Sequence, residues 1–157
     1  MKEKTCCFTG HRDIQKQDYT VLKKRTKDAI VSLINKGVVY FGAGGAIGFD
    51  TLAAETVLEL KKIYPQIKLI LVLPCYEQAR GWKTADVEKY NNIKEQSDKI
   101  VYTSNNYYQG CMHIRNRHLV DNSGYCICYL KKSFGGTAYT VKYAKQKGLT
   151  ILNLFDI

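Results

Sequence analysis

Residues 38–50 read VVYFGAGGAIGFD, an apolar run followed by four glycines within seven positions and then an acid. A hydrophobic strand that passes through glycines into a helix often holds a phosphate, because the helix begins with unpaired N–H groups and a positive dipole end. The spacing differs from the dinucleotide fingerprint G-x-G-x-x-G, since Ile47 occupies the last position, and no P-loop ending of Gly-Lys-Ser/Thr follows. The stretch therefore predicts a strand-to-helix turn that can hold an anion without either standard signature.

Other apolar and β-branched runs recur along the chain, each followed by a polar or glycine turn. The expected strands are residues 4–8, 38–41, 68–73, 99–103, 125–130 and 150–155. Their apolarity is continuous rather than alternating, which is typical of strands covered on both faces, as in a parallel sheet.

Helical patterns lie between these strands. One stripe has helical spacing at Tyr19, Leu22, Thr26, Ala29, Ile30 and Leu33, and further helices are expected at 51–63, 84–97, 112–122 and 137–147. The alternation of strand and helix predicts an α/β fold, a Rossmann-like three-layer sandwich with a mainly parallel sheet of about six strands.

The composition is typical of a globular protein. Of the 157 residues, 45% are hydrophobic and 24% are charged, and no linker, repeat or low-complexity tract interrupts them, so we expect one domain over residues 1–157. The N-terminal residues lack the apolar run of a signal peptide, and no segment approaches the roughly 18 apolar residues of a membrane span. These features predict a cytoplasmic protein with no membrane partner.

Six cysteines raise the question of disulfides or a metal site. Cys6 and Cys7 are adjacent, two others alternate along an apolar strand, and no C-x-x-C pair occurs. We therefore expect buried, reduced thiols and no metal ion. Cys75 and Cys111 lie near the ends of expected elements and are the candidates for reactivity.

The net charge of +10 favours an anionic partner, either a phosphate-bearing ligand, a nucleic acid or an acidic surface. Many of the lysines fall where helices should face water, so solvated basic faces are the alternative explanation of the charge.

In Rossmann-like sheets, ligands bind at the carboxyl ends of the strands, near the point where the strand order reverses. The turns after the strands contain the candidate ligand-binding residues, which are Gly10, His11, Arg12, Gly45, Gly48, Asp50, Arg115, Asn116, Gly135, Gly136 and Thr137. Glycines let the backbone approach a ligand, and arginine offers a planar fork for phosphate or carboxylate. No residue is singled out as catalytic by these patterns alone.

Each of these turns also has a purely structural explanation. Residues 9–12 fit an ordinary turn with a surface arginine, and Asp50 fits a helix cap. Arg115 and Arg117 fit a single charged helix face. The turn at 73–82 contains two aromatic residues and an arginine, for which stacking on a base, a lid or plain packing are the open alternatives.

Five ordered blocks of the sequence are similar to a known family. They are TGHR (9–12), GAIGFDTLAAETVLELKKIYPQIKL (45–69), LPCYEQARGW (73–82), RNRHLVDNS (115–123) and FGGTAYTVKYAKQKG (134–148). Together they resemble the YpsA-like family of small bacterial proteins in the SLOG superfamily, which also includes DNA-processing protein A and the Lonely Guy phosphoribohydrolases. The resemblance spans nearly the whole chain. It implies a Rossmann-like fold with a nucleotide-type ligand at the loops that contain Gly10, Gly45, Gly48, Asp50, Arg115, Gly136 and Thr137.

The Lonely Guy enzymes carry an arginine in M-x-x-R-K and a glutamate in P-G-G-x-G-T-x-x-E. This sequence keeps Met112 and Arg115 of the first segment, with Asn116 in place of the lysine, and has Thr140 where the glutamate belongs. A threonine supplies neither the charge nor the general base of a carboxylate. Hydrolysis of the same kind would need Asp50, Glu77 or Asp121 as a substitute.

The leading hypothesis is that the protein binds or senses a nucleotide or nucleotide-derived ligand, such as a nucleotide sugar or an ADP-ribose derivative, without a cofactor. The alternatives are an N-glycosidic hydrolase that acts on nucleotides, and a protein that binds single-stranded nucleic acid. We also expect a homodimer, since Rossmann-like cores of this size often pair through exposed helices.

Overall fold

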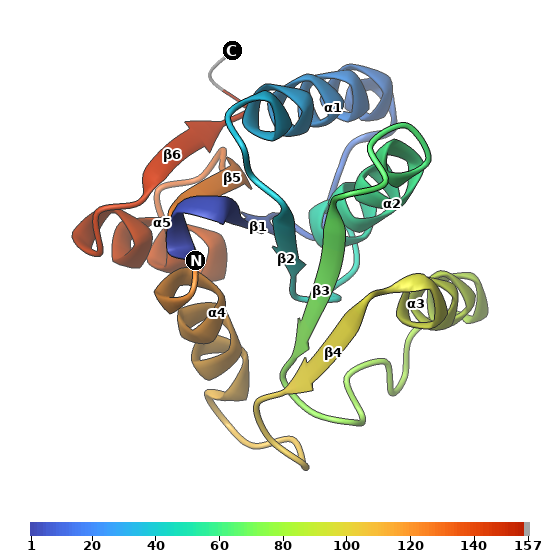
Figure 1. The fold of residues 1–157 in the computed structure, drawn as a ribbon. Coiled ribbons are helices and arrows are strands. Elements are labelled where there is room, and N and C mark those ends of the chain that lie inside the picture. The colour runs from blue at the N-terminus through green and yellow to red at the C-terminus, as the bar shows by residue number, and fades with distance from the viewer. Residues whose placement is uncertain (156–157) are drawn as a thin grey trace.

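The computed structural model describes residues 1–155 and contains one parallel six-stranded sheet with the order β4-β3-β2-β1-β5-β6 (Figure 1). Its strands are β1 (Thr5–Gly10), β2 (Tyr40–Ala43), β3 (Lys68–Leu73), β4 (Lys99–Tyr102), β5 (Tyr125–Tyr129) and β6 (Thr150–Asn153). All neighbouring strands pair in parallel, as their continuous apolarity indicates.

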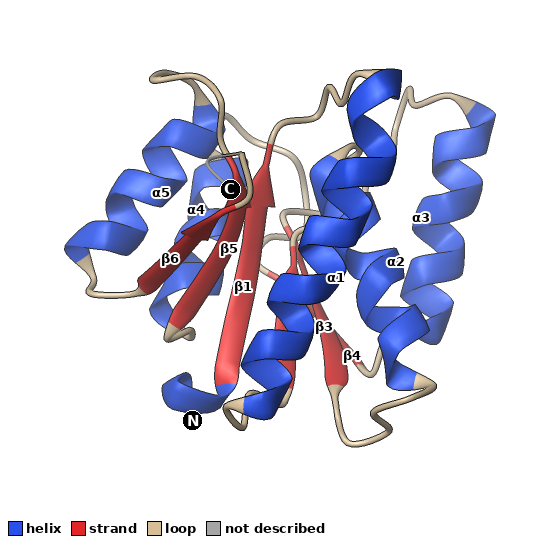
Figure 2. Cartoon of the chain, turned by 90° about the horizontal axis from the view of Figure 1, so that it is seen from above, coloured by secondary structure: helices blue, strands red, loops and turns tan. Residues whose placement is uncertain are grey.

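The helices form two layers around this sheet. They are α1 (Tyr19–Asn35), α2 (Phe49–Lys61), α3 (Thr84–Gln96), α4 (Cys111–Asp121) and α5 (Gly136–Gln146), with short 3-10 turns η1 (Lys2–Lys4) and η2 (Lys16–Asp18). Figure 2 shows α1, α2 and α3 on one side of the sheet and α4 and α5 on the other. This arrangement confirms the predicted Rossmann-like three-layer sandwich. Within residues 1–155, no helix combines the length and apolarity needed to cross a bilayer.

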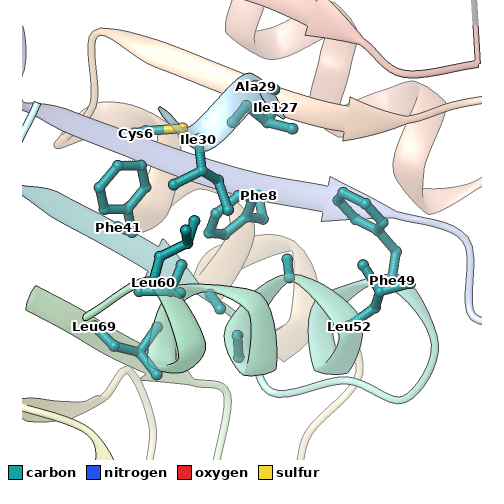
Figure 3. Packing of buried hydrophobic residues seen from close by; sticks show 14 of the residues in the cluster. Cys6, Phe8, Ala29, Ile30, Phe41, Phe49, Leu52, Leu60, Leu69 and Ile127 are labelled. Atoms are coloured by element: carbon teal, nitrogen blue, oxygen red, sulfur yellow. The ribbon is translucent and has the colours of Figure 1, made fainter. Parts of the chain in front are cut away.

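The larger hydrophobic core lies between the sheet and the layer formed by α1 and α2. Phe8 and Phe41 stack across neighbouring strands, and Phe49 at the start of α2 meets Phe8 edge to face (Figure 3). Complete burial of each such side chain contributes roughly 1.5–3 kcal/mol. The first turn of α2 is therefore fixed to β1, which positions the loop between β2 and α2.

A smaller core lies beneath α4 and α5, where Cys7, Cys126 and Cys128 pack among aliphatic side chains. All six cysteines are buried free thiols, as the sequence predicts. Cys75 and Cys111, the two candidates for reactivity, are 0% and 1% exposed, and this burial argues against a reactive role. Reactive thiols are accessible, and these two are not.

Several element boundaries differ from the expected ones. The strand predicted at 38–41 lies at Tyr40–Ala43, because the Val38 N–H donates to the carbonyl of Leu33 at 3.0 Å and closes the end of α1. Tyr19 is 40% exposed and lies outside the buried stripe of α1, in which Ile34 is buried instead.

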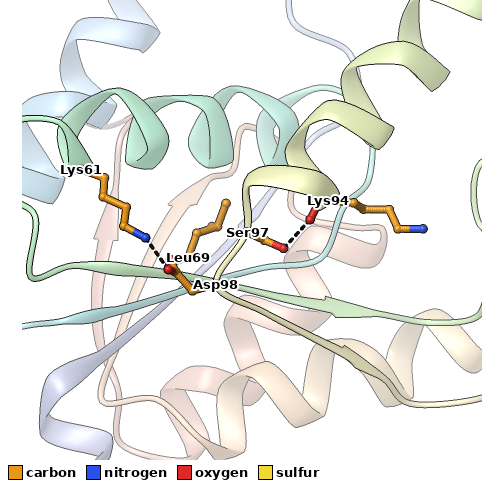
Figure 4. A network of polar contacts seen from close by, with 5 residues as sticks. All are labelled: Lys61, Leu69, Lys94, Ser97 and Asp98. Atoms are coloured by element: carbon orange, nitrogen blue, oxygen red, sulfur yellow. Dashed lines mark hydrogen bonds and ion pairs between the residues drawn. The ribbon is translucent and has the colours of Figure 1, made fainter.

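A polar contact ties α2 to the strands at the edge of the sheet. Asp98 pairs with Lys61 of α2 through one carboxylate oxygen, and the other oxygen accepts the Leu69 N–H at 2.8 Å (Figure 4). Burial opposes ionisation of Asp98, but these hydrogen bonds and the lysine charges outweigh it and lower its pKa. The contact holds α2 and β3 against the start of β4.

The strand order reverses between β1 and β5. The chain proceeds outward from β1 to β4 and then crosses through α4 to β5, on the other side of β1. Loops that leave β1 and β5 in opposite directions open a crevice at their carboxyl ends, which is where such sheets bind ligands.

Candidate anion-binding cleft

A cleft of about 370 Å³ lies at this reversal point. Its walls come from the loops after β1, β2 and β5 and from the first turns of α4. The lining residues are Thr9, Gly10, His11, Arg12, Ala46, Asp50, Met112, His113, Arg115, Asn116, Lys132, Phe134, Gly135, Gly136 and Thr137. Nine of the eleven residues predicted from the sequence therefore lie around one cavity; Gly45 and Gly48 do not line it.

Arg115 is the central cation of the cleft and is only 4% exposed. Its Nη1 donates to the carbonyl of Gly44, its Nε donates to Asn116 Oδ1 at 2.7 Å, and its Nη2 lies 3.7 Å from the sulfur of Met112. Among residues 1–155 it forms no ion pair. Burial lowers the pKa of Arg115, and the charge of nearby Asp50 opposes that shift. A guanidinium still keeps its charge, so the cleft contains a fixed cation that lies near one carboxylate but forms no ion pair with it.

The glycine-rich loop after β2 forms the seat of this arginine. A β-carbon on Gly44 would lie 2.6 Å from Nη1 of Arg115 and 2.8 Å from Cζ, so only glycine lets the guanidinium rest on the loop. The sequence analysis assigned the glycines of this loop to a ligand and did not single out Gly44. Its contact with Arg115 could have been suspected, because a cluster of glycines after one strand and an arginine at the start of a later helix both lie at the same edge of the sheet.

Gly45 and Gly48 do not line the cleft but pack against other parts of the protein. Gly45 has φ +76°, and a β-carbon there would lie 2.5 Å from Leu73. Gly48 has φ +82° and packs against the backbone of Arg12, whose carbonyl oxygen would lie 2.2 Å from a β-carbon. Both positions require glycine for the turn and for close packing, and the contact at Gly48 holds the β1 and β2 loops together.

Asp50 is the only acid among the residues that line the cleft. It occupies the second position of α2, after Gly48 at the N-cap, and its Oδ2 accepts the Ala46 N–H at 3.2 Å. It braces the loop and does not cap the helix. Burial raises the pKa of Asp50, while Arg115 and Arg12 oppose that shift.

His11 is held in one neutral tautomer. Its Nε2 accepts the Lys131 N–H at 2.8 Å, so the proton is on Nδ1. Burial lowers the pKa of His11, and the charges of Lys132 and Lys131 lower it further. The imidazole thus joins the β1 and β5 loops without adding charge.

The start of α5 forms another wall. Gly135 occupies the N-cap with φ +98° and no side-chain cap, and β-carbons on Gly135 and Gly136 would meet nothing within 4 Å. The first N–H groups of a helix have no partners in the helix, and the dipole favours an anion there. The open glycines leave these donors accessible from the cleft.

Six lining residues of the cleft were not among those predicted from the sequence, namely Thr9, Ala46, Met112, His113, Lys132 and Phe134. Lys132 lies shortly after β5, so its position after a strand is the signal that could have identified it. Conversely, Arg117 lies outside the cleft, where it hydrogen-bonds Tyr139.

The geometry also bears on hydrolysis. Thr140 is buried, and its Oγ1 donates to the carbonyl of Gly136 at 2.9 Å. Of the three substitute acids, Glu77 pairs with Arg80 and Asp121 accepts the hydroxyl of Tyr143. Asp50 alone lines the cleft.

These features define a Rossmann-like α/β protein with a cationic cleft at the carboxyl ends of its strands. Residues 6–152 match the family described as the YspA SLOG family, and the chain belongs to this family. The UPF0398 protein BH1768 of Halalkalibacterium halodurans is 33% identical over 141 residues, which cover 88% of this chain and 72% of that protein.

Two solved structures share the fold. DNA processing protein A from Streptococcus pneumoniae has a TM-score of 0.67 at 17% identity, and the match covers 94% of this chain and 48% of that one. This chain thus spans about half the length of the pneumococcal protein. The second is DNA processing protein A from Helicobacter pylori, in a structure that describes its single-stranded DNA binding mode. It has a TM-score of 0.64 at 16% identity, and the match covers 99% of this chain and 71% of that one. At such identities the likeness shows the fold alone.

Proposed function

We propose that this protein binds a nucleotide or nucleotide-derived ligand whose phosphate occupies the cleft between Arg115, Arg12 and the start of α5. The observation that carries this proposal is the guanidinium of Arg115, which is 4% exposed and forms no ion pair within residues 1–155. A buried charge is costly unless it is paired. A phosphate supplies that pairing and also meets the open N–H groups of Gly136 and Thr137.

The presence of Asp50 in the cleft indicates that a sugar lies next to the phosphate of the proposed ligand. A carboxylate repels a phosphate, but it is a good acceptor for the hydroxyl groups of a ribose. Asp50 lines the same cleft as the two arginines and is fixed by the Ala46 N–H. A ribose phosphate satisfies both kinds of group, whereas inorganic phosphate meets only the cations.

Calorimetry with AMP, ADP-ribose, a nucleotide sugar and inorganic phosphate tests the proposal. We expect Arg12→Ala, which removes an exposed cation of the cleft, to weaken nucleotide binding about tenfold, because a hydrogen bond to a charged group contributes about 1.5–3 kcal/mol. Arg117→Ala, at an arginine outside the cleft, is the matched control and should leave the affinity unchanged. Failure of every nucleotide to bind, or equal losses in both variants, would refute the proposal.

The same samples show whether binding leads to hydrolysis. We expect no release of free base above background, because Thr140 provides no carboxylate and its hydroxyl is engaged with Gly136. Chromatography after incubation with nucleoside monophosphates measures this. Turnover that is abolished in Asp50→Asn would support the hydrolase alternative instead.

Single-stranded nucleic acid is a second candidate ligand, favoured by a surface outside the cleft. Arg117 lies 5.6 Å from the ring centroids of both Tyr139 and Tyr143, and Lys147 lies 5.5 Å from that of Tyr143. We call these four residues the α4–α5 strip. Cations interleaved with aromatic rings suit a single strand, and DNA processing protein A of Helicobacter pylori, which shares this fold, binds single-stranded DNA.

The proposal also places the protein in the cytoplasm. Its six cysteines are buried free thiols, which suits a compartment that keeps thiols reduced.

A further inference from the structure

A second cavity, of about 440 Å³, adjoins the cleft. Glu77, Gln78, Arg80, Tyr107 and Met112 line it, and Met112 also lines the first cleft. We propose that this cavity is a base subsite, in which the nucleobase of the ligand stacks on Tyr107 while its phosphate is held at Arg115. The assignment rests on the proposed function and names the part of the ligand that each cavity receives.

The two cavities are fixed relative to each other by one carbonyl. Gly44 O accepts the Nη1–H of Arg115 from the first cleft and the Nε2–H of Gln78 at 3.1 Å from the second. The guanidinium also holds Met112, the wall that both cavities share, through an Nη2–sulfur contact of 3.7 Å. A ligand that spans both cavities therefore meets a preorganised surface, which lowers the ordering cost of binding.

The charges of the two cavities differ in a way that matches the two ends of a nucleotide. The first contains Arg12, Arg115 and Lys132 with a single acid. In the second, Arg80 pairs with Glu77 at 2.8 Å, so the cation of that wall is neutralised. The phosphate is expected in the first cavity and the uncharged base in the second.

Tyr107 offers a free aromatic face. Its side chain is 65% exposed, and within residues 1–155 it has no hydrogen-bond, ring or cation partner. By contrast, Tyr76 stacks on Tyr102 at 4.0 Å and Trp82 packs on Tyr90 at 5.3 Å, so these rings are already engaged.

The loop that carries Tyr107 is braced against its neighbour. The Tyr76 N–H donates to the carbonyl of Asn105 at 3.3 Å, and Ser104 Oγ donates to the carbonyl of Asn106 at 2.9 Å. These bonds hold the loop after β4 beside the loop after β3. Phe134 is the competing ring, exposed at the edge of the first cleft beside Arg12 and Lys132. It does not line the second cavity, so Tyr107 is the platform for a base that lies there.

Calorimetry with AMP and ribose 5-phosphate separates the two subsites, because only AMP has a base. We expect wild-type protein to bind AMP at least about tenfold more tightly, in line with the worth of one base–aromatic stack. Tyr107→Ala should reduce AMP affinity to that of ribose 5-phosphate and leave ribose 5-phosphate binding unchanged. Tyr107→Phe keeps the ring and should retain the preference, and Phe134→Ala is the control on the competing ring.

The experiment distinguishes failure of the base-subsite assignment from failure of the proposed nucleotide binding. If Phe134→Ala abolishes the AMP preference and Tyr107→Ala does not, the base lies on the other side of the cleft while nucleotide binding stands. Equal affinity of wild-type protein for both ligands would show that no base subsite exists. Absence of binding by either ligand would overturn both this assignment and the proposed function.

Discussion

Gly44 determines whether the Arg115 guanidinium can occupy the cleft. A β-carbon at this position would lie 2.6 Å from Nη1 and would displace the side chain or the loop. We expect Gly44→Ala to lower the free energy of unfolding by about 1–3 kcal/mol, the usual cost of overpacking, and to weaken nucleotide binding. Urea denaturation and calorimetry measure the two effects.

Gly136→Ala is the matched control for stability. A β-carbon on Gly136 would meet nothing within 4 Å, and alanine favours a helix more than glycine does. The free energy of unfolding should stay constant or rise by up to about 1 kcal/mol. If the two substitutions destabilise the protein equally, the guanidinium does not depend on the missing β-carbon of Gly44.

His11 makes stability depend on pH. Its pKa is lowered from 6.5 in the folded protein, first by burial and then by the charges of Lys132 and Lys131. Between the lowered value and about 6.5 the unfolded chain binds more protons than the folded one, so the free energy of unfolding falls as pH drops through this window. His11→Gln should reduce the loss of stability between about pH 7.5 and 5.5.

Urea unfolding at the two pH values measures this effect. His118→Gln, at a histidine outside the cleft, controls for the general effect of removing a histidine. An unchanged pH dependence in His11→Gln would contradict the assignment of His11 as a neutral brace between the loops.

Residue types and their positions after strands predicted most of the cleft. Glycine and arginine in these turns were sufficient to identify Arg12, Arg115 and the turn at 135–137. The sequence could not distinguish a glycine that faces a ligand from one that faces another loop. Gly45 and Gly48 were placed with the ligand for this reason but do not line the cleft, since their neighbours, Leu73 and the Arg12 backbone, are adjacent only after folding.

The elements themselves were accessible from the sequence because each strand is a continuous apolar run. The helices expected at 51–63, 112–122 and 137–147 are Phe49–Lys61, Cys111–Asp121 and Gly136–Gln146. Their starts were misjudged by one or two residues, because glycines at 48, 110 and 135 occupy the N-caps without a side-chain cap. A Ser, Thr, Asp or Asn cap would have marked these starts.

At the scale of elements, the contact between α2 and the sheet edge should contribute to the stability of the fold. Asp98 pairs with Lys61 and accepts the Leu69 N–H at 2.8 Å, so Asp98→Ala leaves a backbone donor and a partly buried ammonium without this partner. We expect a loss of about 1–3 kcal/mol in the free energy of unfolding. Asp28→Ala is the control, because the pair of Asp28 with Lys24 is exposed and is worth at most about 0.5 kcal/mol. Equal effects in the two variants would mean that the Asp98 contact is no more than a surface ion pair.

At the scale of the whole molecule, the net charge of +10 predicted an anionic partner but not its place on the surface. The interleaving of cations and rings could not be predicted from the sequence, because the α4–α5 strip combines Arg117 from one helix with Tyr139, Tyr143 and Lys147 from the next. Arg117 and Tyr139 are separated by 22 positions in the sequence. Only the packing of α4 on α5 unites them.

Salt should separate the two modes of anion binding. Phosphate in the cleft meets Arg115, which is 4% exposed and therefore weakly screened, so raising salt from about 50 to 200 mM should weaken nucleotide binding only about two- to threefold. Single-stranded DNA bound to the exposed strip releases counterions, and the two cations of the strip, Arg117 and Lys147, predict a loss of about sevenfold over the same range. Calorimetry and fluorescence anisotropy measure the two affinities.

Arg117→Ala distinguishes the surfaces at constant salt, because this arginine belongs to the strip and not to the cleft. It should weaken the binding of DNA and shorten its salt slope by about one phosphate contact, while nucleotide affinity stays constant. Competition adds the reciprocal check, since AMP at saturation should leave DNA bound if the two surfaces are separate. Parallel salt slopes together with displacement of DNA by AMP would instead place both ligands in the cleft, and the charge of the strip would then serve solubility alone.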